Sequence, residues 1–327
     1  MPTRTSPSPI LPIGLVALDI DGTLIGDDLV IGSDTRVAVA EAMRRGVQVS
    51  LVTGRMVSSA LRFARDLALT GPLVGYQGGL IREMPLRGSG RVGRLLVHTP
   101  IAGPVAREIV EWTRERGMDP HLNHLERFIL REDDPNADDY SAFMGARAEL
   151  VADLPGSIRH PVTKVLAVGE PPLPSELAPL ARAHFVGRAD VTISHPRFLE
   201  FVAPGVSKGR AVRWLARRLG VPLGAALAIG DQWNDLEMLA EVGHGTAMPT
   251  APLAVRAAAR YIAPSVADEG VARMIEELAL ASPRDARAAS ERMAAAASAA
   301  VDAARDEAAA IVAVVVAPGL PAETVPG

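Results

Sequence analysis

Asp19-Ile20-Asp21-Gly22-Thr23-Leu24 is the most informative stretch of this chain for its fold, because it follows directly on the apolar run from Gly14 to Leu18. A short apolar run bounded by such residues predicts a buried strand. Two carboxylates one residue apart then stand at the carboxyl end of that strand, where open α/β sheets bind their ligands. An Asp-Gly pair alone would indicate only a turn. The second carboxylate and the preceding strand favour a functional site.

The sequence around this stretch alternates between short apolar runs and helical patterns, which is typical of βαβ units and a parallel sheet. Ser33 is positioned to cap a helix that runs to about Arg45 and stops at Gly46. A strand at 47–52, a helix at 56–69 and a strand at 72–76 are expected next. The pattern predicts a doubly wound α/β core.

The alternation is interrupted between about Met84 and Pro204, where five apolar runs are interleaved with helical stretches in the manner of a separate α+β unit. After Gly205 the βα pattern resumes, with a helix at 208–219, a strand at 225–229, and helices at about 234–240 and 271–279. We therefore expect a core formed by 14–83 and 205–282, a second domain at 84–204 inserted in it, and a flexible start at 1–13.

The segment 283–327 has a different composition, since 14 of the 28 residues from Pro283 to Ala310 are alanine. Alanine is the best helix former, so one long helix is expected. The six apolar residues from Ile311 to Val316 are too few to span a bilayer. The helix could dock on the core, join two subunits or stay mobile.

Composition excludes several classes of function. The chain has 327 residues, a net charge of -4 and no cysteine, which argues against a nucleic-acid-binding surface and excludes disulfides, thiolate nucleophiles and zinc-thiolate sites. It contains no apolar run of membrane-spanning length, and its start lacks the pattern of a signal peptide. We expect a cytoplasmic protein, monomeric or homodimeric. Only Lys164 and Lys208 are lysine among 34 basic residues, so each requires a reason.

Three further short motifs occur at predicted strand or helix ends. They are Val52-Thr53-Gly54-Arg55, Gly205-Val206-Ser207-Lys208-Gly209 and Gly230-Asp231-Gln232-Trp233-Asn234-Asp235. Each is weak alone: Thr-Gly is a common strand exit, a lysine is usually a solvated helix end, and Asp231 or Asn234 would serve as a helix N-cap. His121 and His124 are a weaker candidate for a metal pair, because their odd spacing on a strand sends them to opposite faces. All seven histidines are expected to be structural or exposed.

In order and position the four motifs resemble those of the haloacid dehalogenase superfamily. The first and second are 53 - 19 = 34 residues apart and the second and third 208 - 53 = 155, so the additional domain lies between motifs two and three. This arrangement is similar to the Cof-type branch, as are Tyr76-Gln77-Gly78-Gly79 and the later stretches 245–248 and 268–272. The resemblance covers about 14–280 and implies a Rossmann-like core with an α+β cap over the active site.

The resemblance implies a phosphatase mechanism that the residue types can perform. Asp19 would attack phosphorus and form an aspartyl-phosphate, while Asp21 would act as general acid and then as base. Lys208 would neutralise charge beside Asp19. Thr53, the Gly54 amide and Asn234 would hydrogen-bond the phosphate oxygens, and Arg55 and Gly78 would also contact the substrate. Mg²⁺ would bind the Asp19 carboxylate, the Asp21 carbonyl and Asp231, with Asp235 holding a metal-bound water.

Some positions depart from the family pattern. Gln77 stands where asparagine is usual, Gln232-Trp233 replaces a small residue, and 248–251 reads Met-Pro-Thr-Ala. For Trp233, buried packing is favoured over a role in the pocket wall. The sequence predicts a Mg²⁺-dependent phosphatase of small phosphorylated metabolites, with sugar phosphates favoured. A phosphomutase, or a non-catalytic regulatory or binding protein on the same scaffold, stays open as an alternative.

Overall fold

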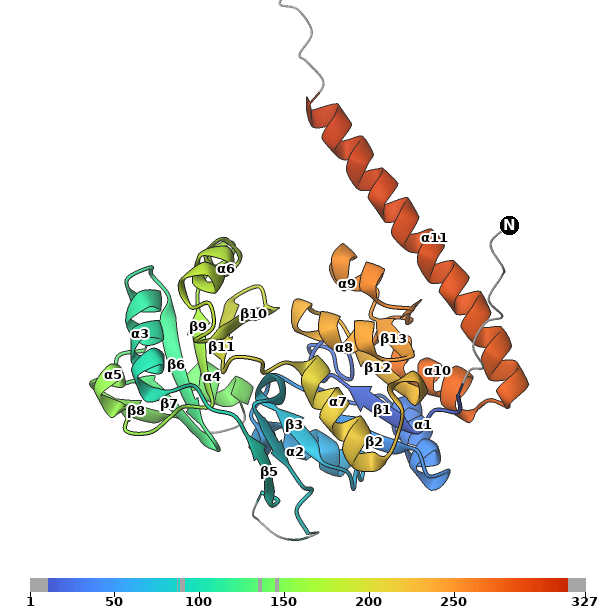
Figure 1. Ribbon diagram of the computed structural model, residues 1–327, viewed down its shortest axis with the longest axis horizontal. Helices are drawn as coiled ribbons and strands as arrows, with labels where there is room; N and C mark the ends of the chain where they lie inside the picture. Colours follow the sequence, from blue (N-terminus) through green and yellow to red (C-terminus); the bar gives the residue numbers. More distant parts are fainter. Residues whose placement is uncertain (1–10, 87, 89–91, 135–136, 145–146, 317–327) are drawn as a thin grey trace, which may run out of the picture.

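The computed structural model describes residues 11–86, 88, 92–134, 137–144 and 147–316. Figure 1 shows two α/β units side by side, and the long C-terminal helix extends from one of them. One unit, the core, contains the segments before and after the insertion, and the inserted segment forms the other unit. This arrangement confirms the predicted fold class. Within the described residues, no helix has the length and apolarity that a membrane crossing requires.

A five-stranded parallel sheet forms the centre of the core, with the strand order β14-β13-β12-β1-β2. Leu18 at the end of β1 is level with Leu51 of β2 and Ile229 of β12, so these three strands end at one edge. The residues that follow them therefore meet. The strands are β1 Leu15–Leu18, β2 Gln48–Leu51, β12 Ala226–Gly230, β13 His244–Ala247 and β14 Tyr261–Ile262.

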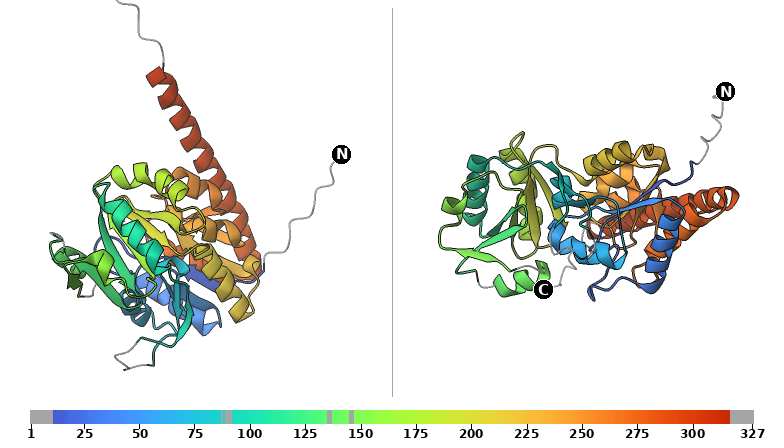
Figure 2. Two further views of the ribbon diagram at one scale, coloured as in Figure 1. Left: turned by 60° about the vertical axis from the view of Figure 1, so that its left-hand side comes forward. Right: turned by 90° about the horizontal axis from the view of Figure 1, so that it is seen from below.

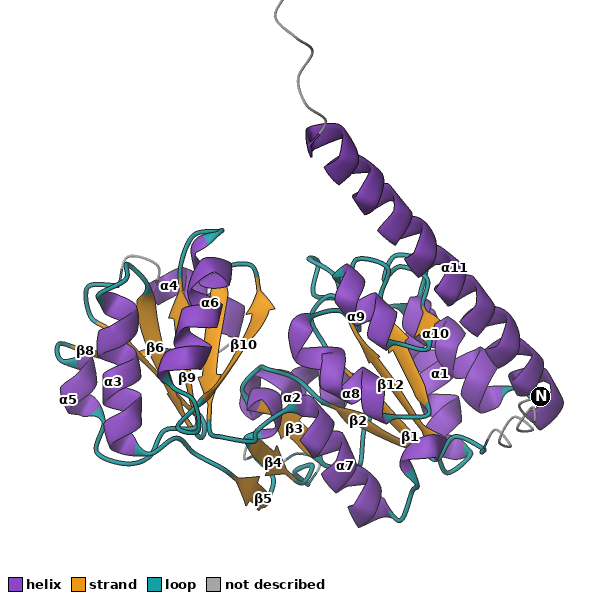
Figure 3. Ribbon diagram, turned by 45° about the horizontal axis from the view of Figure 1, so that its top comes forward, coloured by secondary structure: helices purple, strands orange, loops and turns teal. Residues whose placement is uncertain are grey.

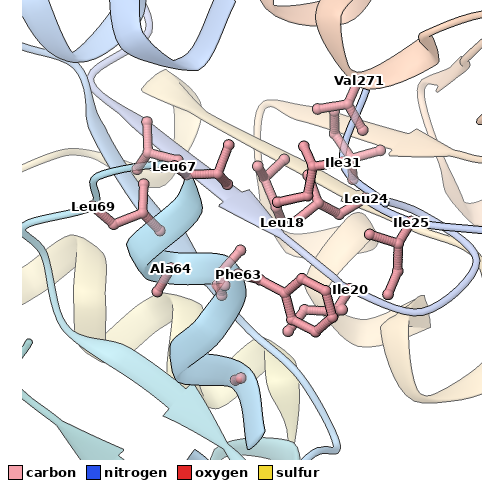
Figure 4. Packing of buried hydrophobic residues seen from close by; sticks show 14 of the residues in the cluster. Leu18, Ile20, Leu24, Ile25, Ile31, Phe63, Ala64, Leu67, Leu69 and Val271 are labelled. Carbon is pink, nitrogen blue, oxygen red and sulfur yellow. The ribbon is translucent and has the colours of Figure 1, made fainter. Parts of the chain in front are cut away.

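Helices cover both faces of this sheet. As a result every residue of β1 is buried, and alternate residues of the strand belong to two different hydrophobic clusters, one on each face. Val16 and Leu18 pack with Val39 and Phe63 on one face, and Leu15 packs with the helices of the other. Figure 4 shows Ile20, Leu24 and Ile25, from the loop after β1, in the same cluster as Phe63. The helices are α1 Ser33–Arg44, α2 Val57–Asp66, α7 Lys208–Leu219, α8 Leu236–Glu241, α9 Leu253–Ala258 and α10 Gly270–Ile275.

A small antiparallel sheet, β3 Leu73–Gly75, β4 Leu80–Arg82 and β5 Leu95–His98, continues the core beyond β2 through a bridge from Val52 to Val74. The sequence places 95–97 inside the inserted domain, but β5 pairs with β4 and belongs to this small sheet. The apolar run alone does not reveal its partner, because pairing is decided by contacts distant in sequence.

The inserted unit, the cap, is built on a six-stranded sheet with the order β10-β11-β9-β6-β7-β8 (Figure 3). Its strands are β6 Asp119–His124, β7 Arg127–Arg131, β8 Glu149–Val151, β9 Lys164–Val168, β10 Asp190–His195 and β11 Phe198–Val202. Its helices are α3 Gly103–Arg114, α4 Ala137–Met144, α5 Leu154–Ser157 and α6 Leu173–His184. Val165 and Phe201 pack on α3 and α6, so the alternation of a strand turns Lys164 and Glu200 to the opposite face.

The alanine-rich tail is a single helix, α11 Pro283–Val316, as expected. Its N-terminal part, as far as Val301, docks on the core: Ala286, Ala289, Ala297 and Val301 are buried, and α11 packs against β14, α9 and the π-helical turn η4 (Glu276–Leu280). Ser290 lies 2.6 Å from the Tyr261 hydroxyl, which in turn lies 3.0 Å from Nδ1 of His244. The rest of the helix projects away from the core (Figure 2).

The expectation that Ser33 caps a helix is wrong. Ser33 does not cap α1, because Gly32 is the N-cap residue and the carboxylate of Glu269 accepts the N–H groups of Asp34 and Thr35 at 3.2 and 3.1 Å. A second long side chain acts in the same way: Gln232, and not Asp231 or Asn234, is the N-cap of the turn η3, Trp233–Asp235, that precedes α8. In both places a longer side chain provides the capping oxygen.

Candidate active site

The motif residues converge at the edge where β1, β2 and β12 end. Nζ of Lys208, the first residue of α7, lies 2.7 Å from Oδ1 of Asp19 and 2.6 Å from Oδ1 of Asp235. All three side chains are buried, and Ser207 fixes the start of α7 by accepting the N–H of Arg210. The lysine therefore ties the loop after β1 to the loop after β12.

The loop after β12 is held by Asp235, whose Oδ2 accepts the backbone N–H groups of Asp231 and Gln232 at 3.1 and 3.0 Å. Gly230 must be glycine, because a Cβ there would lie 2.4 Å from the carboxyl carbon of Asp235. Asp235 therefore shapes this loop as well as pairing with Lys208.

Three carboxylates form a cluster in which a cation fits. Asp19, Asp231 and Asp235 each offer an oxygen within 4.8 Å of the others. Burial raises the pKa of Asp19 well above its usual range, against the pull of Lys208, and burial and then the charge of Asp235 raise the pKa of Asp231 to about 7. One lysine does not compensate this much negative charge, and oxygen ligands of this kind suit a hard divalent cation.

Asp21 points to a different partner. Its carboxylate accepts two hydrogen bonds from the guanidinium of Arg55, at 2.5 and 2.7 Å. Arg55 is buried and Asp21 is half exposed. The backbone N–H of Arg55 donates to Oγ1 of Thr53 at 3.1 Å, so the hydroxyl proton of Thr53 remains for another acceptor.

These groups line a pocket of about 470 Å³ between the core and the cap. Asp19, Asp21, Thr53, Gly54, Arg55, Asp231 and Asn234 line its core side, and Lys164, Leu166, Ser194, His195, Phe198 and Glu200 line its cap side. The structure thus brings together most of the predicted site residues and adds the cap wall that the sequence could not specify.

Two predicted roles have a different setting in the structure. Gly78 does not line this pocket: it adopts φ +105°, and a Cβ there would lie 2.7 Å from the carbonyl of Ser207, so it permits close packing on the start of α7. The expectation that Trp233 is buried is wrong, because the residue is 45% exposed. Trp233 lines a second, smaller cavity of about 220 Å³ behind Lys208.

His121 and His124 do not form a metal pair. Both lie on β6, but Nε2 of buried His121 pairs with Asp134 and Nδ1 of His124 lies 2.8 Å from the carbonyl of Pro161. The expected opposite orientations explain why they have separate partners.

Three polar residues to which the sequence assigned no role at the site lie beside it in the fold: Lys164, Glu200 and Gln77. Each is at most 3% exposed, and Lys164 and Glu200 lie 3.1 Å apart. A signal existed for two of them, since Lys164 is one of two lysines and Glu200 interrupts the apolar run Phe198–Val202. Their joint position depends on strand pairing in the cap.

A family model of haloacid dehalogenase-like hydrolases matches residues 16–275. The chain belongs to this family. The match confirms the predicted superfamily, and the fold with its inserted cap is that of the Cof-type branch. A solved haloacid dehalogenase-like hydrolase from Bacteroides thetaiotaomicron is similar over 81% of this chain and 98% of that one, with a TM-score of 0.69 and 26% identity.

Two of the similar curated proteins are phosphatases by name. The HMP-PP phosphatase of Serratia proteamaculans is 30% identical over 241 residues, covering 72% of this chain and 84% of that protein. The 5-amino-6-(5-phospho-D-ribitylamino)uracil phosphatase of Bacillus subtilis is 28% identical over 271 residues, covering 80% of this chain and 96% of that protein. The activity class of this family member is accordingly that of a phosphatase.

Proposed function

We propose that this chain is a Mg²⁺-dependent phosphomonoester hydrolase that works through an aspartyl-phosphate on Asp19. The observation that carries the proposal is the position of Asp19 on the wall of the pocket, tied to Lys208 at 2.7 Å and clustered with Asp231 and Asp235. A nucleophilic carboxylate needs positive charge around it when a phosphate dianion approaches, and this cluster has both a lysine and room for a cation.

In the first step an Asp19 oxygen forms a bond to phosphorus while the bond from phosphorus to the ester oxygen breaks. Asp21 gives its proton to the departing alkoxide. In the second step water attacks the acyl phosphate, Asp21 takes up the water proton, and inorganic phosphate leaves as the Asp19 carboxylate is restored. Bound Mg²⁺ would offset the charge of the carboxylates and of the phosphoryl oxygens.

Arg55 has a place in this cycle because it lines the same pocket as its partner Asp21. A phosphate dianion is a strong bidentate acceptor for a guanidinium. An entering phosphate therefore competes with the Asp21 carboxylate for Arg55. This exchange releases Asp21 to carry the proton that the leaving group needs.

For the substrate we propose a small phosphorylated metabolite, with sugar phosphates as the first class to test. The pocket volume of about 470 Å³ suits a small molecule, and the names of the relatives specify phosphorylated metabolites. Cap residues in 84–204 would contact the leaving group, among them His195 and Phe198, whose ring centres lie 4.8 Å apart. These two rings make the cap wall partly apolar.

The test is phosphate release from sugar phosphates, nucleotides and p-nitrophenyl phosphate, with Mg²⁺ or with EDTA, by the wild type and Asp19→Asn. Release that needs both Mg²⁺ and Asp19 would support the proposal. Transfer of the phosphoryl group back to the substrate would identify a phosphomutase instead. Absence of both reactions in a folded chain that binds Mg²⁺ would favour a non-catalytic role.

A further inference from the structure

Lys164 and Glu200 form a buried ion pair on the face of the cap that is turned to the core. Lys164 lies on β9 and Glu200 on the neighbouring strand β11, with 3.1 Å between Nζ and Oε1, and Ser194 donates to the same oxygen at 2.6 Å. The side chains are 3% exposed. We call this pair the Lys164–Glu200 bridge. Buried charges persist when they are paired and their remaining hydrogen-bonding atoms also find partners.

Those remaining partners belong to the core. Nζ of Lys164 donates to the carbonyl of Gly54 at 2.9 Å, and Oε2 of Glu200 accepts from Nε2 of Gln77 at 2.7 Å. Oε1 of Gln77 in turn accepts from Nδ2 of Asn234 at 3.0 Å. One continuous hydrogen-bonded chain thus runs from the loop after β2, through two cap strands, to the loop after β12.

Both ends of this chain are residues assigned to the phosphate. The peptide unit between Gly54 and Arg55 is held at its carbonyl by Lys164 and at its N–H by Thr53. At the other end, Gln77 takes one of the two N–H bonds of the Asn234 amide and leaves the second. The contacts therefore hold Gly54 in place on one loop and orient the amide of Asn234 on the other.

Steric details support a fitted arrangement. A Cβ on Gly54 would lie 2.4 Å from Nε2 of Gln77, so only glycine allows the two to meet. Gln77 itself has φ +61°, a left-handed conformation that is uncommon for residues other than glycine. Such a conformation persists where surrounding contacts hold it in place.

We propose that Lys164 and Glu200 are positioning residues that make the phosphate site complete only when the cap is closed. The inference rests on the proposed function, because it gives Gly54 and Asn234 a phosphate to bind. A polar connection suits this task, since water can replace each hydrogen bond when the cap moves away. Closure of the cap over a substrate then orders the donors that hold its phosphate.

The first test measures inorganic phosphate binding by calorimetry with Mg²⁺ present. Lys164→Met keeps the length of the side chain and removes its charge. We expect the phosphate Kd to rise about tenfold, the size of effect given by the loss of one charge-assisted hydrogen bond. Lys164→Met/Glu200→Gln removes both buried charges, and its Kd is expected to match that of Lys164→Met because the two residues act as one unit.

The matched control is Phe185→Leu. Phe185 is fully buried on the opposite face of the cap sheet, 5.5 Å from the ring of Phe201. This change leaves a cavity and lowers cap stability without touching the core. Its phosphate Kd should equal that of the wild type. If Lys164→Met lowers the melting temperature as Phe185→Leu does but leaves the phosphate Kd unchanged, the bridge is structural and the inference is wrong.

Turnover separates this inference from the proposed function. Lys164→Met should lower kcat/KM about equally for p-nitrophenyl phosphate and for the best metabolite, because the phosphate is common to both. A wild type without hydrolysis whose phosphate Kd still depends on Lys164 overturns the proposed function and retains the bridge. If the wild type hydrolyses esters and both bridge variants keep its phosphate Kd and kcat/KM, the proposed function is retained and the role of the bridge is overturned. A wild type that binds no phosphate overturns the bridge.

Discussion

Protonation of His244 should weaken the folded state between pH 6.5 and 4. His244 on β13 is 2% exposed and lies next to Tyr261, through which it connects to Ser290 of α11. Burial, and then the charge of Arg260, lowers the pKa of His244 from 6.5 to about 4. In that range the unfolded chain binds a proton that the folded chain excludes, so stability falls as pH falls.

The magnitude follows from the two pKa values. Full protonation of the unfolded chain costs the fold at most about 3 kcal/mol, at 1.36 kcal/mol for each pH unit of separation. At pH 5 the loss is about 2 kcal/mol, and at pH 7 it is nearly absent. Below pH 4 both states carry the proton and this contribution stops changing.

The assay is urea unfolding at half-unit steps from pH 7.5 to 4 for the wild type and His244→Asn. Asparagine retains a polar atom near Nδ1 and does not titrate, so the difference between the two curves should change by about 2 kcal/mol between pH 7 and 5. His160→Asn, at an exposed histidine, is the matched control. Parallel curves for wild type and His244→Asn across this range would refute the reasoning.

Three further outcomes are expected. Lys208→Met should abolish turnover. Without added cation it should also lower the free energy of unfolding by about 3–5 kcal/mol, because the buried carboxylates of Asp19 and Asp235 lose their partner. A loss below about 1 kcal/mol in urea unfolding would contradict this prediction. Mg²⁺ at a hundred times its Kd should stabilise the wild type by about 2.7 kcal/mol in thermal unfolding, and Asp231→Asn should remove most of that gain; an equal gain in both places the cation elsewhere. Glu269→Ala should destabilise the fold by about 1–2 kcal/mol through the start of α1, with Ser33→Ala as the control that leaves the unfolding midpoint unchanged.

The loops that carry Asp19, Thr53 and Asp231 were predictable from the sequence, because the residues that define each loop are adjacent in the chain. Asp19, Thr53 and Asp231 each follow an apolar run, and parallel strands end at a common edge, so their meeting follows from the strand pattern. Lys208 was identifiable since it opens a helix in a chain almost without lysine. In such places one short segment determines the position of the side chain.

The rest depends on contacts between distant segments. Glu269 replaces Ser33 as the cap of α1 only because α10 packs beside α1. Trp233 looked like a packing residue, but the turn η3 directs it outward. The hydrogen bond from Lys164 to the carbonyl of Gly54 joins residues that are 110 positions apart in sequence, and no periodic pattern predicts it.

The placement of the cap between the two halves of the core has a consequence for the order of folding. The central strand β1 pairs with β12, and Leu15 lies opposite Ala226, which is 211 residues further along the chain. The core sheet is therefore complete only after this distant segment has been synthesised. The cap does not depend on so distant a segment, since all residues of one of its hydrophobic clusters lie between Ile101 and Val206. Contacts of short sequence separation form faster than distant ones. During synthesis from the N-terminus the cap would therefore fold before the core, whose sheet is completed last.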